Sequence, residues 1–190
     1  RTAFFVAGIP GILLAIAVLF VREPARGSSE TQNIAEQKRS GSPYRLILTS
    51  PTMILIIISG SIHNFNMYAI ATFITPYLMR YHGADIQWAN LVTTAVFGLM
   101  GAPGLMLGGY IGDTMLKRRT DGRLLVPTVA IMVSVPLLFF ALNASQGNIL
   151  AFAILMGVAC ALMYFYYSCV YPSIHDIIEP GLRGTAMAIY

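Results

Sequence analysis

The sequence predicts an all-α, polytopic membrane protein, on the basis of its composition and the spacing of its charges. Hydrophobic residues make up 56% of the chain and charged residues only 11%, whereas a soluble domain carries about 25% charged residues. The few charges are separated by long apolar runs. An α-helix needs roughly 20 apolar residues to cross about 30 Å of hydrocarbon, and membrane barrels show short alternating segments instead. We therefore expect a bundle of transmembrane helices.

Six apolar runs follow one another along the chain. Four of them contain no charged residue: Ala3–Val21, Trp88–Ile111, Leu124–Leu142 and Ile149–Tyr171. The run Pro51–Met79 contains His63 but no Asp, Glu, Lys or Arg, and a sixth run begins at Gly184 and reaches Tyr190. Because the chain starts at Arg1 and shows no cleavable signal sequence, we expect it to be a piece of a larger protein.

The basic residues concentrate in alternate connections between these runs. One side of the membrane receives Arg22, Arg26, Lys38, Arg39, Arg45, Lys117, Arg118, Arg119, Arg123 and Arg183. The other side receives only Arg1 and Arg80. The positive-inside rule therefore places the larger group in the cytoplasm. This asymmetry explains the basic composition, and no nucleic-acid partner is expected.

Residues 23–50 form the one long connection. Its middle is rich in Ser, Gly and Gln and cannot bury apolar area, so a flexible cytoplasmic linker is expected. Pro24 ends the preceding helix and Pro51 opens the next one. One helix, a long linker and then closely connected helices predict a junction between two bundles.

The stretch G-G-Y-I-G-D-T-M-L-K-R-R at residues 108–119 joins an apolar helix to a group of charges. Gly104, Gly108 and Gly112 recur every four residues, which predicts a smooth stripe for ordinary helix packing or for a sliding contact. The glycines are expected to end the helix, which places Asp113 at a C-terminus where an acid is disfavoured. We expect Asp113 to have a partner, either a basic residue or the N-terminus of another helix; a solvated Asp113 is the alternative.

The run S-G-S-I-H-N-F-N-M-Y at residues 59–68 places polar side chains in the middle of a predicted span. Such groups usually face a cavity or a partner helix. His63, Asn66 and Met67 are expected to share one face, and Gly60 with the two Asn residues predicts a weakened or broken helix. The predicted cavity residues in this run are His63, Asn64, Asn66, Met67 and Tyr68. The alternative is that neighbouring helices satisfy these polar groups.

A second cluster, Y-F-Y-Y-S-C-V-Y, spans residues 164–171. Tyr164 and Tyr167 fall on one helical face and are predicted to form an amphipathic wall of the same cavity. Tyr171 is better explained by the aromatic belt at the membrane interface.

The sequence offers little support for catalysis. His175 and Glu179 share a helical face, but a metal site needs three or four ligands, and Pro180 and Arg183 favour a surface loop. No phosphate-binding glycine loop, nucleophile elbow or Cys/His cluster is present. We expect no catalytic residue, no cofactor and no metal, and an ATP-driven pump would need a nucleotide-binding domain.

With these features the sequence resembles the major facilitator superfamily. That family carries a loop of the form G-x-x-x-D-(R/K)-x-G-(R/K)-(R/K), which Gly109, Asp113, Lys117 and Arg118 match in part, since Thr114 and Leu116 replace the usual base and glycine. V-R-E-P at 21–24 resembles the end of its sixth helix, and E-P-G-L-R-G-T-A at 179–186 resembles its tenth-to-eleventh loop. F-F-V-A-G-I-P-G-I-L-L-A at 4–15 and R-G-T-A-M-A at 183–188 are most similar to the spinster-like branch.

The resemblance implies a partial chain of a twelve-helix transporter, from the sixth helix to the start of the eleventh. Residues 1–22 would be the last helix of the first six-helix half, 23–50 the linker between the halves, and 51–190 the truncated second half. It also implies that Gly109, Asp113, Lys117 and Arg118 form a conformational latch. The partner of Asp113 would then lie on the fifth helix, outside this chain.

The predicted function is secondary-active transport by alternating access, in the plasma membrane or a bacterial inner membrane. The resemblance implies a lysolipid-like or sphingolipid-like amphipath, or an organic anion, as the cargo; a drug, sugar acid or other small metabolite is the alternative. A different class would be an intramembrane enzyme using His63 or His175, or a membrane sensor that does not transport. The expected partners are the substrate, the lipid bilayer and the missing first-half helices.

Overall fold

The computed structural model describes residues 2–21 and 42–190. The chain divides into two compact units, Arg1–Ser40 and Gly41–Tyr190, which are described separately. In the first unit, α1 (Thr2–Val18) is an apolar helix that contains Pro10. Most of the predicted linker, residues 22–41, lies outside the described residues.

The second unit is built from helices. They are α2 (Pro43–Leu48), α3 (Pro51–Tyr81), α4 (Ile86–Thr94), the π-helical η1 (Ala95–Leu99), α5 (Met100–Leu116), α6 (Gly122–Leu142), α7 (Ile149–Ile177), the 3-10 helix η2 (Pro180–Leu182) and α8 (Arg183–Ile189). Over the described residues, four continuous helices are long and apolar enough to cross a membrane: 51–81, 86–116, 122–142 and 149–177. The predicted all-α, multi-pass membrane fold is confirmed.

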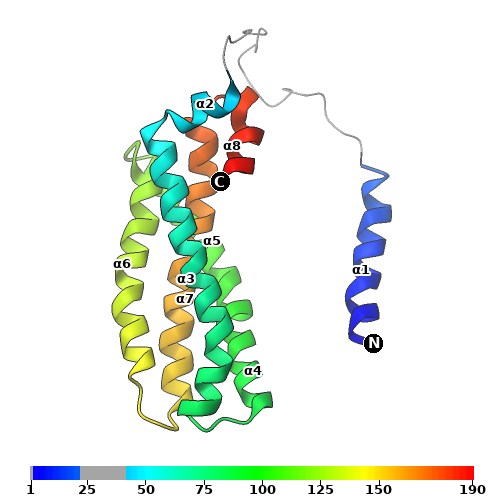
Figure 1. The fold of residues 1–190 in the computed structure, drawn as a ribbon, viewed down its shortest axis with the longest axis vertical. Coiled ribbons are helices and arrows are strands. Elements are labelled where there is room, and N and C mark those ends of the chain that lie inside the picture. The colour runs from blue at the N-terminus through cyan, green and yellow to red at the C-terminus, as the bar shows by residue number, and fades with distance from the viewer. Residues whose placement is uncertain (1, 22–41) are drawn as a thin grey trace. The chain divides into compact units, whose positions relative to one another are not determined.

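The four long helices run alternately up and down, with α7 packed against α5 and α6 (Figure 1). Helices α2 and α8 contact each other at one end of the bundle. We call this the basic end, because it holds Arg45, Arg183 and the loop 117–121. The opposite end holds the two short turns 82–85 and 143–148.

Both turns at the opposite end follow from their sequences. Gly83 and Gly147 adopt φ angles of 66° and 82°, a backbone region that favours glycine. The side chain of Asp85 accepts a hydrogen bond from the Gln87 backbone N at 3.2 Å, and Asn148 does the same for Ala151 at 3.2 Å. These are N-caps, so each turn ends one helix and starts the next within a few residues.

The helix from Ile86 to Leu116 contains a one-residue insertion in its packing pattern. Its buried positions are Ala89, Val92, Val96, Gly101, Gly104, Gly108 and Gly112. All steps are three or four residues except the step of five from Val96 to Gly101, which crosses η1. There the backbone N of Met100 bonds the carbonyl of Ala95, the i to i+5 pattern of a π-bulge. The bulge keeps the positions before and after it on the buried side of the helix, where α4 packs against α3 and α5 packs against α7.

The glycine stripe packs against α7 inside the bundle. A methyl group at Gly104 would lie 2.5 Å from the carbonyl oxygen of Ala161, and one at Gly108 would lie 2.5 Å from Ser168 Oγ. At Gly112 it would lie 2.8 Å from Cys169 Sγ. Of the two readings left open by the sequence, the structure supports ordinary helix packing, because only hydrogen at these positions lets the two backbones approach.

Three local expectations are wrong. Helix α3 continues through Gly60 without a break, because Ser59 and Asn64 bond side chains of α7 and the missing Cβ accommodates the ring of Tyr190. Helix α5 does not end at its glycines but reaches Leu116. Residues 43–48, placed in the linker, form α2, because Ile47 is buried to 1% exposure against the bundle.

Candidate functional site

His63 lies in the middle of α3 and faces α7. Its residue exposure is only 6%. The imidazole stacks on the ring of Tyr166, with centroids 4.2 Å apart and planes at 19°, and meets Tyr167 edge-on at 5.1 Å. Its Nε2 atom is buried and has no hydrogen-bond partner within the described residues. A buried polar atom without a partner costs about 1–3 kcal/mol, a state that both nitrogens of His82 share at the opposite end of the bundle.

Two hydrogen bonds join α3 to α7 on either side of His63. The hydroxyls of Ser59 and Tyr166 are 2.8 Å apart, and the Tyr167 hydroxyl donates to Asn64 Oδ1 at 2.8 Å. We call these five residues, Ser59, His63, Asn64, Tyr166 and Tyr167, the polar cluster. It joins two membrane-length helices through aromatic rings and uncharged polar groups.

The structure brings together only some of the predicted cavity residues. His63, Asn64 and Tyr167 meet in the polar cluster, and Tyr164 lies beside it with its ring centroid 6.0 Å from that of Tyr167. Met67 is buried in the packing one turn further along α3.

Asn66 and Tyr68 form no hydrogen bond with the polar cluster among the described residues. Both are exposed, Tyr68 to 74%. Asn66 lies within one turn of the buried His63 and Met67 on α3, and it lines the space between α3, α6 and α7. The buried face of α3 includes Gly60, His63 and Met67, and the long side chain of Tyr167 reaches Asn64 beside it.

Sequence reasoning missed Tyr166 and Ser59. Tyr166 belongs to the aromatic run 164–171, but the face predicted to line the cavity was that of Tyr164 and Tyr167. The signal for Tyr166 was present in the spacing of Tyr166, Val170 and Ile174, which are buried together. Ser59 lies one turn from His63, and its role required knowledge of the neighbouring helix.

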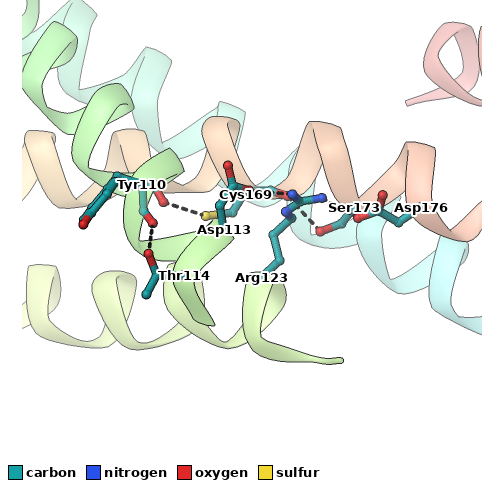
Figure 2. A network of polar contacts seen from close by, with 8 residues as sticks. Tyr110, Asp113, Thr114, Arg123, Cys169, Ser173 and Asp176 are labelled. Atoms are coloured by element: carbon teal, nitrogen blue, oxygen red, sulfur yellow. Dashed lines mark hydrogen bonds and ion pairs between the residues drawn. The ribbon is translucent and has the colours of Figure 1, made fainter. Parts of the chain in front are cut away.

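A second group of polar contacts lies at the basic end (Figure 2). Arg123 of α6 donates to Asp113 of α5, with Nη2 and Oδ1 2.5 Å apart, and also pairs with Asp176 of α7. The side chain of Arg123 is 15% exposed, whereas those of Asp113 and Asp176 are 63% and 55% exposed. Three helices thus meet at one guanidinium.

The charge of each residue in this group is unfavourable for its own helix. Asp113 and Asp176 lie in the last turns of α5 and α7, and Arg123 lies in the first turn of α6. Acids near a C-terminus and bases near an N-terminus oppose the helix dipole. Because the three residues meet, each charge is compensated by a neighbour rather than by its own helix. Arg123 supplies the basic partner that the sequence predicts for Asp113.

The other predicted latch residues lie near this group without joining it. Lys117 and Arg118 are exposed and form no ion pair with another described residue. Gly109 faces Ser168, where an added methyl group would make ordinary contact at 3.8 Å. In the same loop, hydrogen bonds from Arg119 lower the pKa of Asp121. A partner of Asp113 on a helix outside this chain stays a prediction.

The His175–Glu179 stretch gives no support for a metal centre. No group of three or more His, Cys, Asp or Glu side chains in the described ranges is arranged to hold a metal ion. The backbone carbonyl of His175 instead accepts a hydrogen bond from Arg183 Nε at 3.0 Å. This contact ties the end of α7 to the start of α8.

Comparison with known proteins agrees with this architecture. A family model described as Major Facilitator Superfamily matches residues 1–190. The chain is similar to an MFS-type efflux pump of Mycolicibacterium smegmatis, with 23% identity over 190 residues, which is 100% of this chain and 43% of that protein. The chain thus spans about two fifths of the length of this curated relative. No solved structure matches the chain.

Proposed function

Because the chain belongs to the major facilitator superfamily, we propose that it is part of a secondary-active transporter that works by alternating access. The polar cluster is the proposed substrate contact, and Gly109, Asp113, Lys117 and Arg118 are the proposed conformational latch, with Asp113 also paired to Arg123. The name of the mycobacterial relative, an efflux pump, supports export as the direction. The proposed location is the plasma membrane or a bacterial inner membrane.

The observation that carries this proposal is the unpaired, buried Nε2 of His63. Polar groups inside a membrane span usually face a cavity or pair with one another. Ser59, Asn64, Tyr166 and Tyr167 pair across the helix interface, but His63 contributes one nitrogen that the described residues leave unpaired. A ligand that enters when the helices separate would satisfy this atom.

The proposed cargo is an amphipath of the lysolipid or sphingolipid type. The rings of Tyr164, Tyr166 and Tyr167 and the neutral groups of Asn64 and Ser59 suit a molecule with both apolar and polar parts. An organic anion receives less support, because no Lys or Arg lies in 51–79 or 149–171 to neutralise it. In this proposal the rest of the protein contributes the remaining walls of the substrate site. Its residues therefore also determine which cargo is bound.

Flux through the reconstituted full-length protein tests the proposal. Vesicles carrying the protein and an imposed proton or sodium gradient are given three probes in turn: a fluorescent lysophospholipid, ethidium and radiolabelled gluconate. Saturable, gradient-dependent flux of the lysophospholipid is the expected result. Saturable flux of only ethidium or gluconate would support the transporter proposal and contradict the proposed cargo. No flux of any probe by folded protein would contradict the proposed function.

A further inference from the structure

A cavity of about 300 Å³ lies between α3, α6 and α7 toward the opposite end of the bundle. Its apolar walls include Ile74 from α3, Leu138 from α6, and Phe152 and Met156 from α7. Ile74, Phe152 and Met156 are at most 3% exposed. The volume and the largely apolar walls are those of a small-molecule site.

Tyr77 lines one end of this cavity, and its hydroxyl is already hydrogen-bonded. The Tyr77 hydroxyl donates to the carbonyl oxygen of Leu142 at 2.6 Å, which ties α3 to α6. The Tyr77 ring stacks on Phe152, with centroids 5.4 Å apart and planes at 29°. Tyr77 therefore offers the cavity a ring face, and its hydroxyl is engaged elsewhere.

The polar group left for a ligand is at the other end. Asn66 lines the cavity, and its amide makes no hydrogen bond to another described residue. Helix α3 rises roughly 16 Å from Asn66 to Tyr77, and the cavity walls between them are apolar. No charged side chain lines the cavity, so a charged ligand would lose its hydration without gaining a counter-ion.

We propose that this cavity is a binding site for an uncharged, single-chain amphipath, such as a medium-chain alcohol. The hydroxyl of the ligand bonds the Asn66 amide, and its alkyl chain lies along the apolar walls toward Tyr77. The site is separate from the polar cluster, since no residue of the cluster lines the cavity. The inference does not depend on transport, because binding is measured on the protein without a gradient.

Photolabelling of the full-length protein in lipid nanodiscs tests this site. The probe is 1-octanol carrying a diazirine in its chain, and the labelled residues are located by peptide mass spectrometry. We expect saturable labelling on 69–77 and 138–156, reduced by excess unlabelled 1-decanol. Labelling that does not saturate, or that spreads evenly over exposed apolar residues such as Phe65, would overturn the proposal.

Two substitutions on different sides of α3 provide the matched comparison. Ala69→Phe fills the cavity from its wall, whereas Ala71→Phe adds the same ring to an exposed position of α3 outside it. Ala69→Phe is expected to abolish saturable labelling and Ala71→Phe to leave it unchanged. Equal effects of the two variants would contradict the site.

The choice of an uncharged ligand has its own test, on a variant expected to fold because Asn66 is exposed. Asn66→Leu is expected to lower the affinity for the octanol probe about fivefold, the loss of one neutral hydrogen bond. The matching diazirine-bearing octanoate is expected to label the cavity at least tenfold less than the alcohol. Octanoate labelling equal to that of the alcohol, or an unaltered affinity in Asn66→Leu, would overturn the assigned chemistry.

Discussion

The imidazole of His63 lies flat on the ring of Tyr166, with the two centroids 4.2 Å apart. The stacked ring fills the interface between α3 and α7, while Nε2 is left without a partner in the described part of the chain. The ring therefore contributes to the packing of α3 against α7, and Nε2 is available to hydrogen-bond a ligand. These two contributions can be separated by substitution.

His63→Phe keeps an aromatic ring and removes both nitrogens. We expect the full-length variant to unfold at nearly the wild-type temperature, because the stacking survives. Transport per folded molecule is expected to fall about five- to tenfold, the effect of one lost hydrogen bond to the substrate. His63→Ala also removes the ring and is expected to lose about 3 kcal/mol of stability.

His82→Phe at pH 7.5 is the control for this experiment. His82 is also a buried histidine among aromatic rings, but it lies at the opposite end of the bundle, outside the polar cluster. Its replacement is expected to leave transport intact. If His63→Phe transports normally, His63 is a packing residue and the substrate site lies elsewhere.

Arg123→Gln removes the cation that Asp113 and Asp176 share. Because both carboxylates are more than half exposed, the expected loss of stability is only about 1 kcal/mol, and it should shrink in 1 M salt as screening increases. Thermal unfolding at low and high salt measures the effect. Lys117→Gln is the matched control, since Lys117 is exposed and unpaired among the described residues; an equal loss in that variant would show that only net charge matters.

Asp113→Asn tests the latch rather than the fold. We expect slower turnover, because a bias of about 1 kcal/mol between two conformations changes their ratio about fivefold. Substrate affinity within one conformation should change little, since Asp113 lies at the basic end and far from the polar cluster. Single-turnover and steady-state transport assays separate the two quantities. A normal rate in normally expressed Asp113→Asn protein would mean that the ion pair is structural only.

Adjacent glycines on α5 are expected to respond differently to the same substitution. Gly108→Ala places a methyl group 2.5 Å from Ser168 Oγ and 2.7 Å from Phe165 Cα, whereas Gly109→Ala places one 3.8 Å from Ser168 Cβ. Overpacking costs about 1–3 kcal/mol, so Gly108→Ala should be destabilised. Gly109→Ala should be neutral or slightly stabilised, since alanine favours a helix. The unfolding temperatures of the two variants test this prediction. Equal unfolding temperatures would contradict the close packing of α5 on α7.

The stability of the opposite end is expected to depend on pH through His82. Burial lowers the pKa of His82 from its usual value of 6.5, and its neighbours are the rings of Tyr77, Tyr81 and Phe152. The unfolded chain therefore binds this proton more readily than the folded one. Stability that is present above pH 6.5 is lost as the pH falls toward the lowered pKa. The drop in unfolding temperature between pH 7.5 and pH 5 should be smaller in His82→Phe, and an equal drop would assign the effect to other groups.

The membrane helices were predictable because hydrocarbon imposes a length and a composition that the sequence must show by itself. Four of the six predicted runs fall inside the four long helices of the bundle. Their ends were predicted less well. Helix α5 continues past Gly112, because Asp113 is compensated from a neighbouring helix and Thr114 Oγ1 donates to the Tyr110 carbonyl at 2.7 Å.

The residues of the polar cluster were predictable by type but not by direction. A histidine and two asparagines in a span indicate a polar contact whatever the fold is. Which of them contacts α7 depends on the position of that helix: Asn64 bonds Tyr167, whereas Asn66 lines the cavity between α3, α6 and α7. Arg123 was read only as a topology signal, because its two carboxylate partners are ten and 53 residues away in the chain.

The π-helical η1 adds one residue to the helix 86–116, and the relative orientation of the two parts of that helix depends on it. Deleting any residue between Ala95 and Leu99 would restore an ordinary α-helix and would rotate everything after it by about 100° relative to everything before it. Ala89 and Val92 would then face the bundle while Gly104, Gly108 and Gly112 faced away, and larger side chains would meet Ala161 and Phe165 in their place. A chain that lost this residue would need a new surface on α7 as well, so the two helices can change length only together.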